Sequence, residues 1–366
     1  MSIKRFSLLL MGVGLILNTV SAQEEVKTSK SWIEKGFFNH LEVGVNAGST
    51  GIGIDVATSV SKYARLRVGF TYMPRFQMKS NFGVSLGDSA YHRTYSPTTG
   101  KRTDKLGKMI DYMHDLTGMT IEDNVDMVYK PTFYNSKLLV DVFPFTDKRW
   151  HFTAGFYYGT REIGRAVNSV EDATTLAGVS FYNYIYDKVA EDNPNIFGDL
   201  ISITPEVLNR IKPMFLNAGR MGMHVGRYKH NVYGQVAVLD ELGYPVYDDE
   251  GNPMYEQGII HAKGSYYMMT PDPENCTVKC YAKTRRFKPY VGGGYSGSIS
   301  KDKLWNLDVD LGVLFWGGTP HVYTHDGTDL TRDVYGIQGK VGKYIDAIAS
   351  VKVFPVLEVR ISRRIF

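Results

Sequence analysis

The clearest pattern in this chain is the alternation of apolar and polar residues at every second position. Leu66, Val68 and Phe70, for example, alternate with Arg67 and Gly69. Successive side chains of a β-strand face opposite sides of a sheet, so such a segment predicts a strand with one apolar face. The pattern occurs in eight segments, at about 41–47, 52–57, 65–72, 134–142, 150–158, 287–295, 305–315 and 353–366.

The connections between these segments fall into two length classes that alternate along the chain. Short turns at 61–64, 144–149 and 298–303 lie on one side. On the other side one short turn, 48–50, is followed by loops at about 74–133, 160–286 and 317–350. Short turns on one side, long loops on the other and an even strand number are typical of outer-membrane barrels. The predicted fold class is therefore all-β: a transmembrane antiparallel β-barrel of about eight strands with long extracellular loops. Segments 75–84 and 219–238 would raise the count to ten or twelve if they joined the ring.

Large aromatic residues occur where the predicted strands begin and end, on the apolar face. Aromatic rings prefer the two membrane–water interfaces, so this placement predicts one aromatic girdle at each rim of the barrel. Two of these residues lie at the short-turn rim and four at the other rim: Trp150 and Trp305, then Tyr72, Tyr134, Tyr158 and Phe315.

Acidic and basic residues nearly balance on the opposite, inward face. The interior of an eight-stranded barrel is barely wider than its side chains, and buried charges need partners. The expected arrangement is a salt-bridged interior, and an ion-selective pore is the alternative. Asp55 and Asp141 flank the strand that carries Arg65 and Arg67. Lys288 and Arg360 flank the strand that carries Asp308 and Asp310. The predicted lumen charges are Glu42, Asp55, Arg65, Arg67, Lys137, Asp141, Lys288, Asp308, Asp310, Glu358 and Arg360.

The N-terminus predicts export. Residues 1–22 combine a basic start, an apolar run and a small-residue end, which is the pattern of a cleavable signal peptide. A periplasmic segment, 23–37, and the barrel with its loops, 38–366, are expected to follow. No later apolar stretch reaches the roughly 20 residues of a membrane helix, so a membrane span must use strands. Loss of Lys4 and Arg5 reduces the 42 basic residues to 40, against 38 acidic ones, which gives no electrostatic case for a nucleic-acid partner.

The long loops contain helix signals and a short repeat. Thr103 is the expected N-cap of a helix with an apolar face, Ser169 and Asp172 start a second helix, and Thr204 starts a third before Pro205. Residues 240–247 and 248–255 repeat a turn followed by a short strand, which predicts a small β-meander.

The sequence contains few candidates for a disulfide, a metal site or a catalytic site. Export favours a disulfide between Cys276 and Cys280. Residues four apart in a straight strand are about 13 Å apart, so this disulfide requires a bend between the two cysteines, and the sequence leaves both the bonded and the free state open. Asp326, Asp329 and Asp333 fit a polar loop better than a calcium site, and neither they nor the cysteines predict a metal or another cofactor. The histidines are scattered and no Gly-x-Ser-x-Gly motif occurs, so an enzyme is not expected.

Three strand segments also carry a family resemblance. Leu41–Gly48, Phe287–Tyr295 and Val353–Arg360 resemble the largely uncharacterised outer-membrane β-barrel proteins of Bacteroidota. The resemblance implies an outer-membrane location and a barrel fold, and it supplies no catalytic residue. Chains of this kind end in an aromatic residue that is in phase with the lipid-facing set and is recognised by the barrel insertion machinery. Phe366 ends this chain out of phase with Ile361, so either a bulge near Ser362 restores the phase or the terminal signal is weak.

The sequence thus predicts a non-enzymatic surface protein. Its barrel contacts outer-membrane lipid, and its long loops contact an unknown ligand or another protein, since loops of this length in compact proteins are usually functional. A small-solute pore and a lipid-modifying enzyme are the alternatives.

Overall fold

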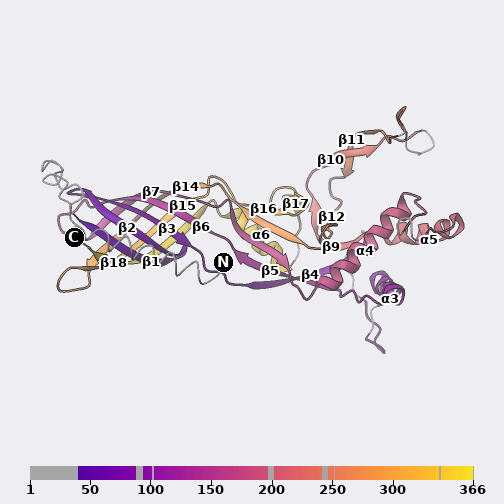
Figure 1. Cartoon of the computed structure of the whole chain (residues 1–366), viewed down its shortest axis with the longest axis horizontal. Helices are drawn as coiled ribbons and strands as arrows, with labels where there is room; N and C mark the ends of the chain where they lie inside the picture. Colours follow the sequence, from indigo (N-terminus) through magenta and orange to yellow (C-terminus); the bar gives the residue numbers. More distant parts are fainter. Residues whose placement is uncertain are drawn as a thin grey trace, which may run out of the picture.

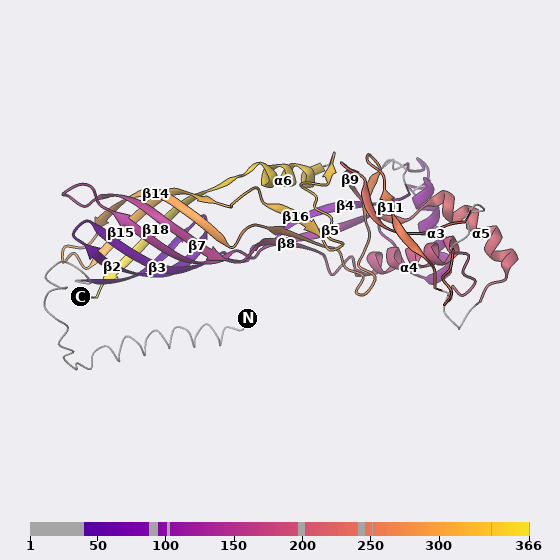
Figure 2. The same ribbon diagram turned by 90° about the horizontal axis from the view of Figure 1, so that it is seen from above.

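The molecule is elongated, with a closed barrel at one end and a β-rich extension that carries helices at the other (Figures 1 and 2). The computed structural model describes residues 40–87, 94–100, 103–196, 202–240, 246–250, 252–337 and 339–365. The predicted signal peptide, the segment 23–37 and Phe366 lie outside the described residues, so what the sequence indicates about them stays a prediction.

Eight antiparallel strands close into a ring in the order β1-β18-β15-β14-β7-β6-β3-β2. The ring confirms the predicted barrel of eight strands, and the two segments considered as additional strands lie outside it. The barrel strands are β1 (Leu41–Gly48), β2 (Gly51–Ser61), β3 (Ala64–Tyr72), β6 (Tyr134–Val142), β7 (Trp150–Gly159), β14 (Phe287–Ser298), β15 (Trp305–Phe315) and β18 (Val353–Arg364).

The outer surface of the barrel is apolar. Leu311, midway along β15, and Phe152 in β7 each expose 66% of their surface, and the outward residues of the neighbouring strands are also exposed and mostly aliphatic or aromatic. A water-soluble protein rarely leaves so many large apolar side chains uncovered over one continuous surface. The exterior therefore suits a hydrocarbon environment.

The last strand keeps an unbroken register to Arg364, which pairs with Glu42 of β1. Ser362 faces inward and is buried, while Ile361 and Ile365 are exposed. The bulge that would have restored the phase near Ser362 is therefore not formed in the described part of β18.

The long segments between barrel strands form a second sheet, the extension sheet. Its strands run in the order β12-β9-β4-β5-β8-β13-β16, and β17 pairs with β9. They are β4 (Met78–Leu86), β5 (Asn124–Pro131), β8 (Glu162–Asn168), β9 (Met221–Tyr228), β12 (Tyr266–Met269), β13 (Lys279–Lys283), β16 (His321–Thr324) and β17 (Val334–Tyr335). The extension has its own apolar core, which includes Val84, Met127, Leu176, Met221 and Tyr267.

The described residues of the extension form the helices α3 (Lys105–Thr117), α4 (Ala173–Ala190), α5 (Pro205–Ala218) and α6 (Gly339–Ser350). The expected cap of α3 was one residue off, because Asp104, and not Thr103, accepts the hydrogen bond from the Gly107 amide at 2.9 Å. Thr204 caps α5 as expected. None of the described helices is long and apolar enough to cross a membrane.

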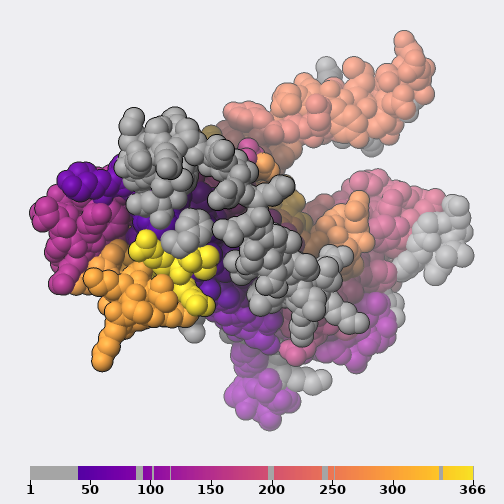
Figure 3. Space-filling view, turned by 60° about the vertical axis from the view of Figure 1, so that its left-hand side comes forward, coloured from indigo at the N-terminus to yellow at the C-terminus, as the bar shows by residue number. Residues whose placement is uncertain are grey.

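A separate hairpin, β10 (Val232–Ala237) with β11 (Tyr255–His261), projects from the extension. At its tip lies the repeat, where backbone hydrogen bonds link three short segments. The Val238 amide donates to the Met254 carbonyl, the Val246 amide to the Val238 carbonyl, and the Met254 amide to the Val246 carbonyl. This ladder is the expected small meander in the described part of the repeat. Figure 3 shows the hairpin in salmon, at the upper right, standing apart from the rest of that face.

The disulfide that the sequence left open is not formed, because Cys276 and Cys280 are both free thiols. Cys276 has a left-handed backbone with φ 51°. Cys280 is buried in β13 with its sulfur 3.9 Å from the Met269 sulfur. Burial raises the pKa of the Cys280 thiol to about 12, which keeps it protonated and unreactive.

Replacing Leu311 by arginine tests the apolar exterior. A cation near the middle of the lipid-facing surface should lower the free energy of unfolding by about 2 to 4 kcal/mol. Urea unfolding of the protein refolded in lipid vesicles measures this. Val170→Arg is the control, because Val170 lies in the extension and is 88% exposed. Equal stability of both variants would mean that Leu311 does not face lipid.

Candidate functional site

The interior of the barrel holds all eleven of the predicted lumen charges, and every one of them is buried. They form one ion-pair network that crosses the lumen, with Lys288 as the exception described below. Burying an ion costs several kcal/mol unless partners compensate it, so the contacts of each group decide whether the arrangement is stable.

Two arginines of β3 reach carboxylates on both sides of the lumen. The Arg67 guanidinium lies 2.7 Å from Asp141 of β6 and 2.7 Å from Asp310 of β15. Arg65 lies 2.8 Å from Asp141 and 3.3 Å from Asp308. Strand β15 stands opposite β3, at the same number of steps in either direction around the ring, so these contacts span the full width of the barrel.

Arg360 and Lys137 complete the network. Arg360 donates to Asp55 at 2.6 Å, to Asp308 at 2.7 Å and to Glu42 at 3.1 Å. Lys137 of β6 donates to Glu358 of β18, on the opposite wall, at 2.5 Å, and lies 3.3 Å from Asp55. Every carboxylate of the network thus contacts at least two basic side chains.

Lys288 departs from the expected pairing with Asp308 and Asp310. Its ammonium donates to the Asn135 side chain at 3.1 Å and to the Thr160 carbonyl at 3.2 Å, and it has no ion pair with any described carboxylate. The reason is position along the strand: Asp310 pairs with Gly294 of β14, six residues beyond Lys288. The sequence indicated which strands are adjacent, but not how far along the barrel axis each charged residue lies.

Sequence reasoning missed His151 as a member of the network. Its Nε2 lies 2.7 Å from Asp310, and its Nδ1 lies 3.2 Å from the Ser296 hydroxyl, which itself donates to Asp308. The inward phase of His151 within β7 was the available signal. A second contact of this kind joins His40 Nδ1 to the Ser59 hydroxyl at 3.1 Å.

Glycines on the inward face make room for the network. A Cβ on Gly294 would lie 2.5 Å from Asp310 Oδ1 and 2.8 Å from His151 Nε2. A Cβ on Gly44 would lie 2.8 Å from Arg360 Nε. These two glycines therefore leave the space that the charged side chains occupy.

An aromatic layer closes the lumen on the side of the extension. Tyr157 and Tyr290 meet edge to face at 5.6 Å between ring centroids, and Phe133 meets Trp316 in the same way at 5.7 Å. This layer is an apolar cluster of buried residues: Phe133, Leu139, Tyr157, Tyr290, Leu314, Trp316 and Val356.

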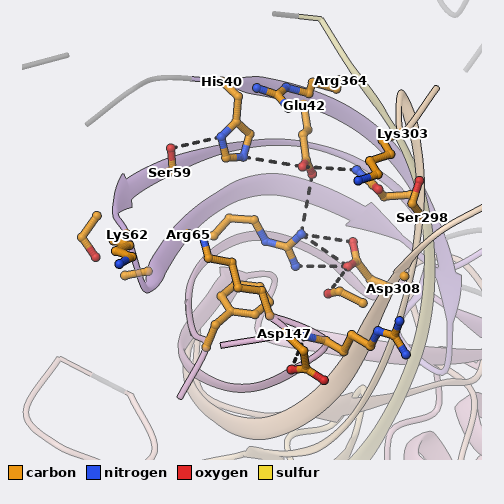
Figure 4. Close-up of a pocket in the computed structure, with 18 residues that line it drawn as sticks. His40, Glu42, Ser59, Lys62, Arg65, Asp147, Ser298, Lys303, Asp308 and Arg364 are labelled. Atoms are coloured by element: carbon orange, nitrogen blue, oxygen red, sulfur yellow. Dashed lines mark hydrogen bonds and ion pairs between the residues drawn. The ribbon is translucent and has the colours of Figure 1, made fainter. Parts of the chain in front are cut away.

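At the short-turn end the lumen opens into a cavity of about 820 Å³, here called the vestibule. Its walls come from the ends of β1, β2, β3, β14, β15 and β18 and from the turns β2–β3, β6–β7 and β14–β15. Figure 4 shows Arg65 on the inner side of this cavity, pointing toward Glu42 and Asp308. The ion pairs of Arg65 separate the vestibule from the rest of the lumen.

The six predicted girdle residues are all exposed on the outside of the barrel. Tyr72 is the register partner of Tyr134, and Tyr158 is that of Phe287, at the extension rim. Trp150 packs edge to face on Tyr295 at 5.3 Å at the short-turn rim. Aromatic rings therefore lie at both rims, about one strand length apart.

The three aspartates of 325–333 contact other residues of the extension. Asp326 accepts from the Tyr267 hydroxyl at 2.8 Å, and Asp329 lies 2.7 Å from His321. Asp333 lies 3.8 Å from Arg332. Within the described ranges no group of three or more acidic, histidine or cysteine side chains is arranged to hold a metal ion.

No protein-family model and no curated protein matches the chain. Among solved structures it is similar to CarO2 of Acinetobacter baumannii, with 14% identity over 89% of this chain and 98% of that one and a TM-score of 0.33. CarO of the same organism gives 12% identity over 88% and 96% and a TM-score of 0.33. A major outer membrane protein from Thermus thermophilus gives 10% identity over 89% and 98% and a TM-score of 0.23. The closed order of eight strands and their apolar outer surface define the barrel.

Removing one partner from the network tests its role in stability. Lys137→Met leaves Glu358 buried, and its one remaining basic partner among the described residues is Arg67 at 3.9 Å. An uncompensated buried charge should cost about 3 to 5 kcal/mol of unfolding free energy. Equilibrium unfolding in lipid vesicles measures the loss.

The matched variant is Lys137→Met combined with Glu358→Gln, which removes both charges and should recover most of the lost stability. If the double variant were as unstable as Lys137→Met alone, packing around Lys137, and not its charge, would explain the effect.

Proposed function

We propose that this chain is a non-enzymatic outer-membrane β-barrel protein whose barrel anchors the extension, and whose extension binds a ligand or another component of the outer membrane. The observation that carries the proposal is the combination of a filled lumen with a folded extension. A lumen occupied by ion pairs and aromatic rings holds the ring rigid, and the extension has an apolar core of its own.

The exterior supports an outer-membrane location. A continuous apolar surface between two aromatic rims matches the band that a barrel presents to lipid. The resemblance of three strand segments to the outer-membrane barrels of Bacteroidota and the predicted signal peptide agree with it. The short turns then face the periplasm and the extension faces outward, because bacterial barrels keep their long connections on the extracellular side. Recognition of the C-terminal strand by the insertion machinery is part of the same proposal.

The filled lumen favours an anchor over a small-solute pore. A pore requires a continuous water-filled path, whereas here ion pairs span the lumen from β3 to β15 and from β6 to β18. The aromatic layer lies between that network and the extension. A solute would have to displace both.

The serine–histidine contacts give no support to a hydrolase. A nucleophilic serine donates its proton to the histidine that acts as base. The Ser296 hydroxyl donates instead to Asp308, so its proton is not directed at His151, whose two ring nitrogens lie beside Ser296 and Asp310.

The projecting hairpin is the part of the extension best suited to contact a partner. Tyr233 and Tyr255 lie on the same face and are 63% and 59% exposed, and Ile259, the register partner of Tyr233, is exposed beside them. An isolated two-stranded hairpin is only marginally stable in water, and exposed aromatic residues are enriched where proteins bind one another.

A photo-crosslinking residue placed at Tyr233 tests this proposal in intact cells of the native host. Irradiation should give one discrete adduct of higher mass, because a specific partner presents one surface to the hairpin. Mass spectrometry of the adduct then identifies that partner.

The same residue at Val170, which is exposed elsewhere in the extension, is the control and should give no discrete adduct. An absence of adducts from Tyr233, Tyr255 and Ile259 alike would contradict binding by the hairpin. Protection of the extension from protease added to intact cells would contradict its extracellular placement.

A further inference from the structure

The proposed anchor function does not involve the vestibule. It lies at the opposite end of the molecule from the hairpin, and its volume of about 820 Å³ is within the range of pockets that hold small molecules, roughly 300 to 1,000 Å³. Its lining is strongly unbalanced in charge. Six lysine and arginine side chains line it, Lys62, Arg65, Lys148, Arg149, Lys303 and Arg364, against three carboxylates.

The carboxylates of the vestibule are already engaged. Glu42 and Asp308 accept hydrogen bonds from Arg360, and both also face Arg65. Asp147 accepts from the backbone amide of Arg149 at 3.2 Å. By contrast, Lys62, Lys148 and Lys303 have no ion pair with any residue that the structure describes, and all three are exposed toward solvent. The vestibule therefore presents uncompensated positive charge at its rim.

Two of these lysines occupy a costly backbone conformation. Lys148 has φ 52° and Lys303 has φ 57°, one in each of two turns that face the vestibule. Turns that need a positive φ favour glycine, asparagine or aspartate, because a larger side chain is strained there. Strain of this kind tends to be kept at functional sites. Both turns thus carry a lysine at the position where local structure favours a smaller residue.

One serine hydroxyl of the lining is placed to donate. The Ser61 hydroxyl accepts from the Tyr63 amide at 3.2 Å, and a serine hydroxyl that accepts one hydrogen bond can donate another to a phosphate oxygen. Several cations around one concave space match a group with more than one negative charge and several acceptor oxygens. A single carboxylate would leave most of the cations without a partner.

We propose that the vestibule binds a phosphate-bearing anion, either a soluble phosphate ester or the headgroup of a phospholipid, with Lys148 and Lys303 as its principal contacts. The site does not depend on the hairpin or on its partner. If the short turns face the periplasm, both sources of phosphate are within reach of this cavity.

Binding of pyrophosphate to the purified full-length protein in a non-ionic detergent tests the proposal. Calorimetry at low ionic strength should give saturable binding with one site per chain. Lys303→Gly should raise the Kd about fivefold, the effect of one charge-assisted contact at a partly exposed site, and Lys148→Gly with Lys303→Gly should raise it further. Glycine suits the positive φ of both turns, so these variants should keep the stability of the parent.

Lys301→Gly is the matched control, because Lys301 lies in the same turn as Lys303 but does not line the vestibule. It removes the same charge and should leave the Kd within about twofold of the parent value, since distant surface charges interact weakly. An equal weakening by Lys301→Gly, an absence of saturable binding, or equally tight binding of succinate would each overturn the proposal.

Nanodiscs identify the source of the phosphate. If phosphatidylglycerol in a phosphatidylcholine disc displaces pyrophosphate from the parent protein, the occupant is a lipid headgroup. If it does not, while pyrophosphate still binds, the occupant is a soluble phosphate ester.

Discussion

The structure depends on mutual neutralisation of charges inside a narrow ring. Each buried ion would cost several kcal/mol if left alone, so the six carboxylates and their basic partners must be placed together or not at all. Arg67 shows the constraint most directly, because it contacts Asp141 on the next strand and Asp310 on the opposite wall. A wider ring would separate these groups, and a narrower one could not contain the arginine. The number of strands and the inward charges therefore specify one another.

The long axis of the molecule divides into four layers with different chemistry. The vestibule is polar and basic, the network is charged but neutralised, the aromatic layer is apolar, and the extension has a core of its own. Figure 2 shows the barrel and the extension following one another from the short-turn end to the helices. This order separates any ligand of the vestibule from any partner of the hairpin, because the filled lumen lies between them.

The barrel could be predicted from the sequence because its strands have one side in an apolar environment and one side in a polar interior. That asymmetry produces the period of two, which identified the eight strands and the eleven predicted lumen charges. Contacts across the lumen, such as Lys137 with Glu358, could not be predicted, because they depend on ring closure and on the height of each residue in the barrel. The vestibule and the aromatic layer were missed for the same reason. Tyr157 and Tyr290 lie in the inward phase of their strands, but the other inward residues of these strands are polar residues or glycines and indicate a polar lumen.

The strands of the extension sheet were harder to predict because they do not alternate apolar and polar residues as regularly as the barrel strands. In β9 nearly every residue from Met221 to Val225 is buried, so apolar residues follow one another without alternation. Such runs do not distinguish a buried strand from a helix or an irregular loop. Helix α6 was also missed, since no capping signal marks its start, whereas Thr204 before Pro205 marked α5 clearly.

Conductance is the most direct test of the central claim, which is that paired charges and aromatic rings fill the lumen. The full-length protein should be inserted into a planar lipid bilayer, with insertion verified by protease protection of the barrel. A filled lumen predicts no steady current at moderate voltage in potassium chloride. Reproducible single-channel openings of constant size would contradict the account, because ions would then have a continuous path past Arg67 and Tyr157.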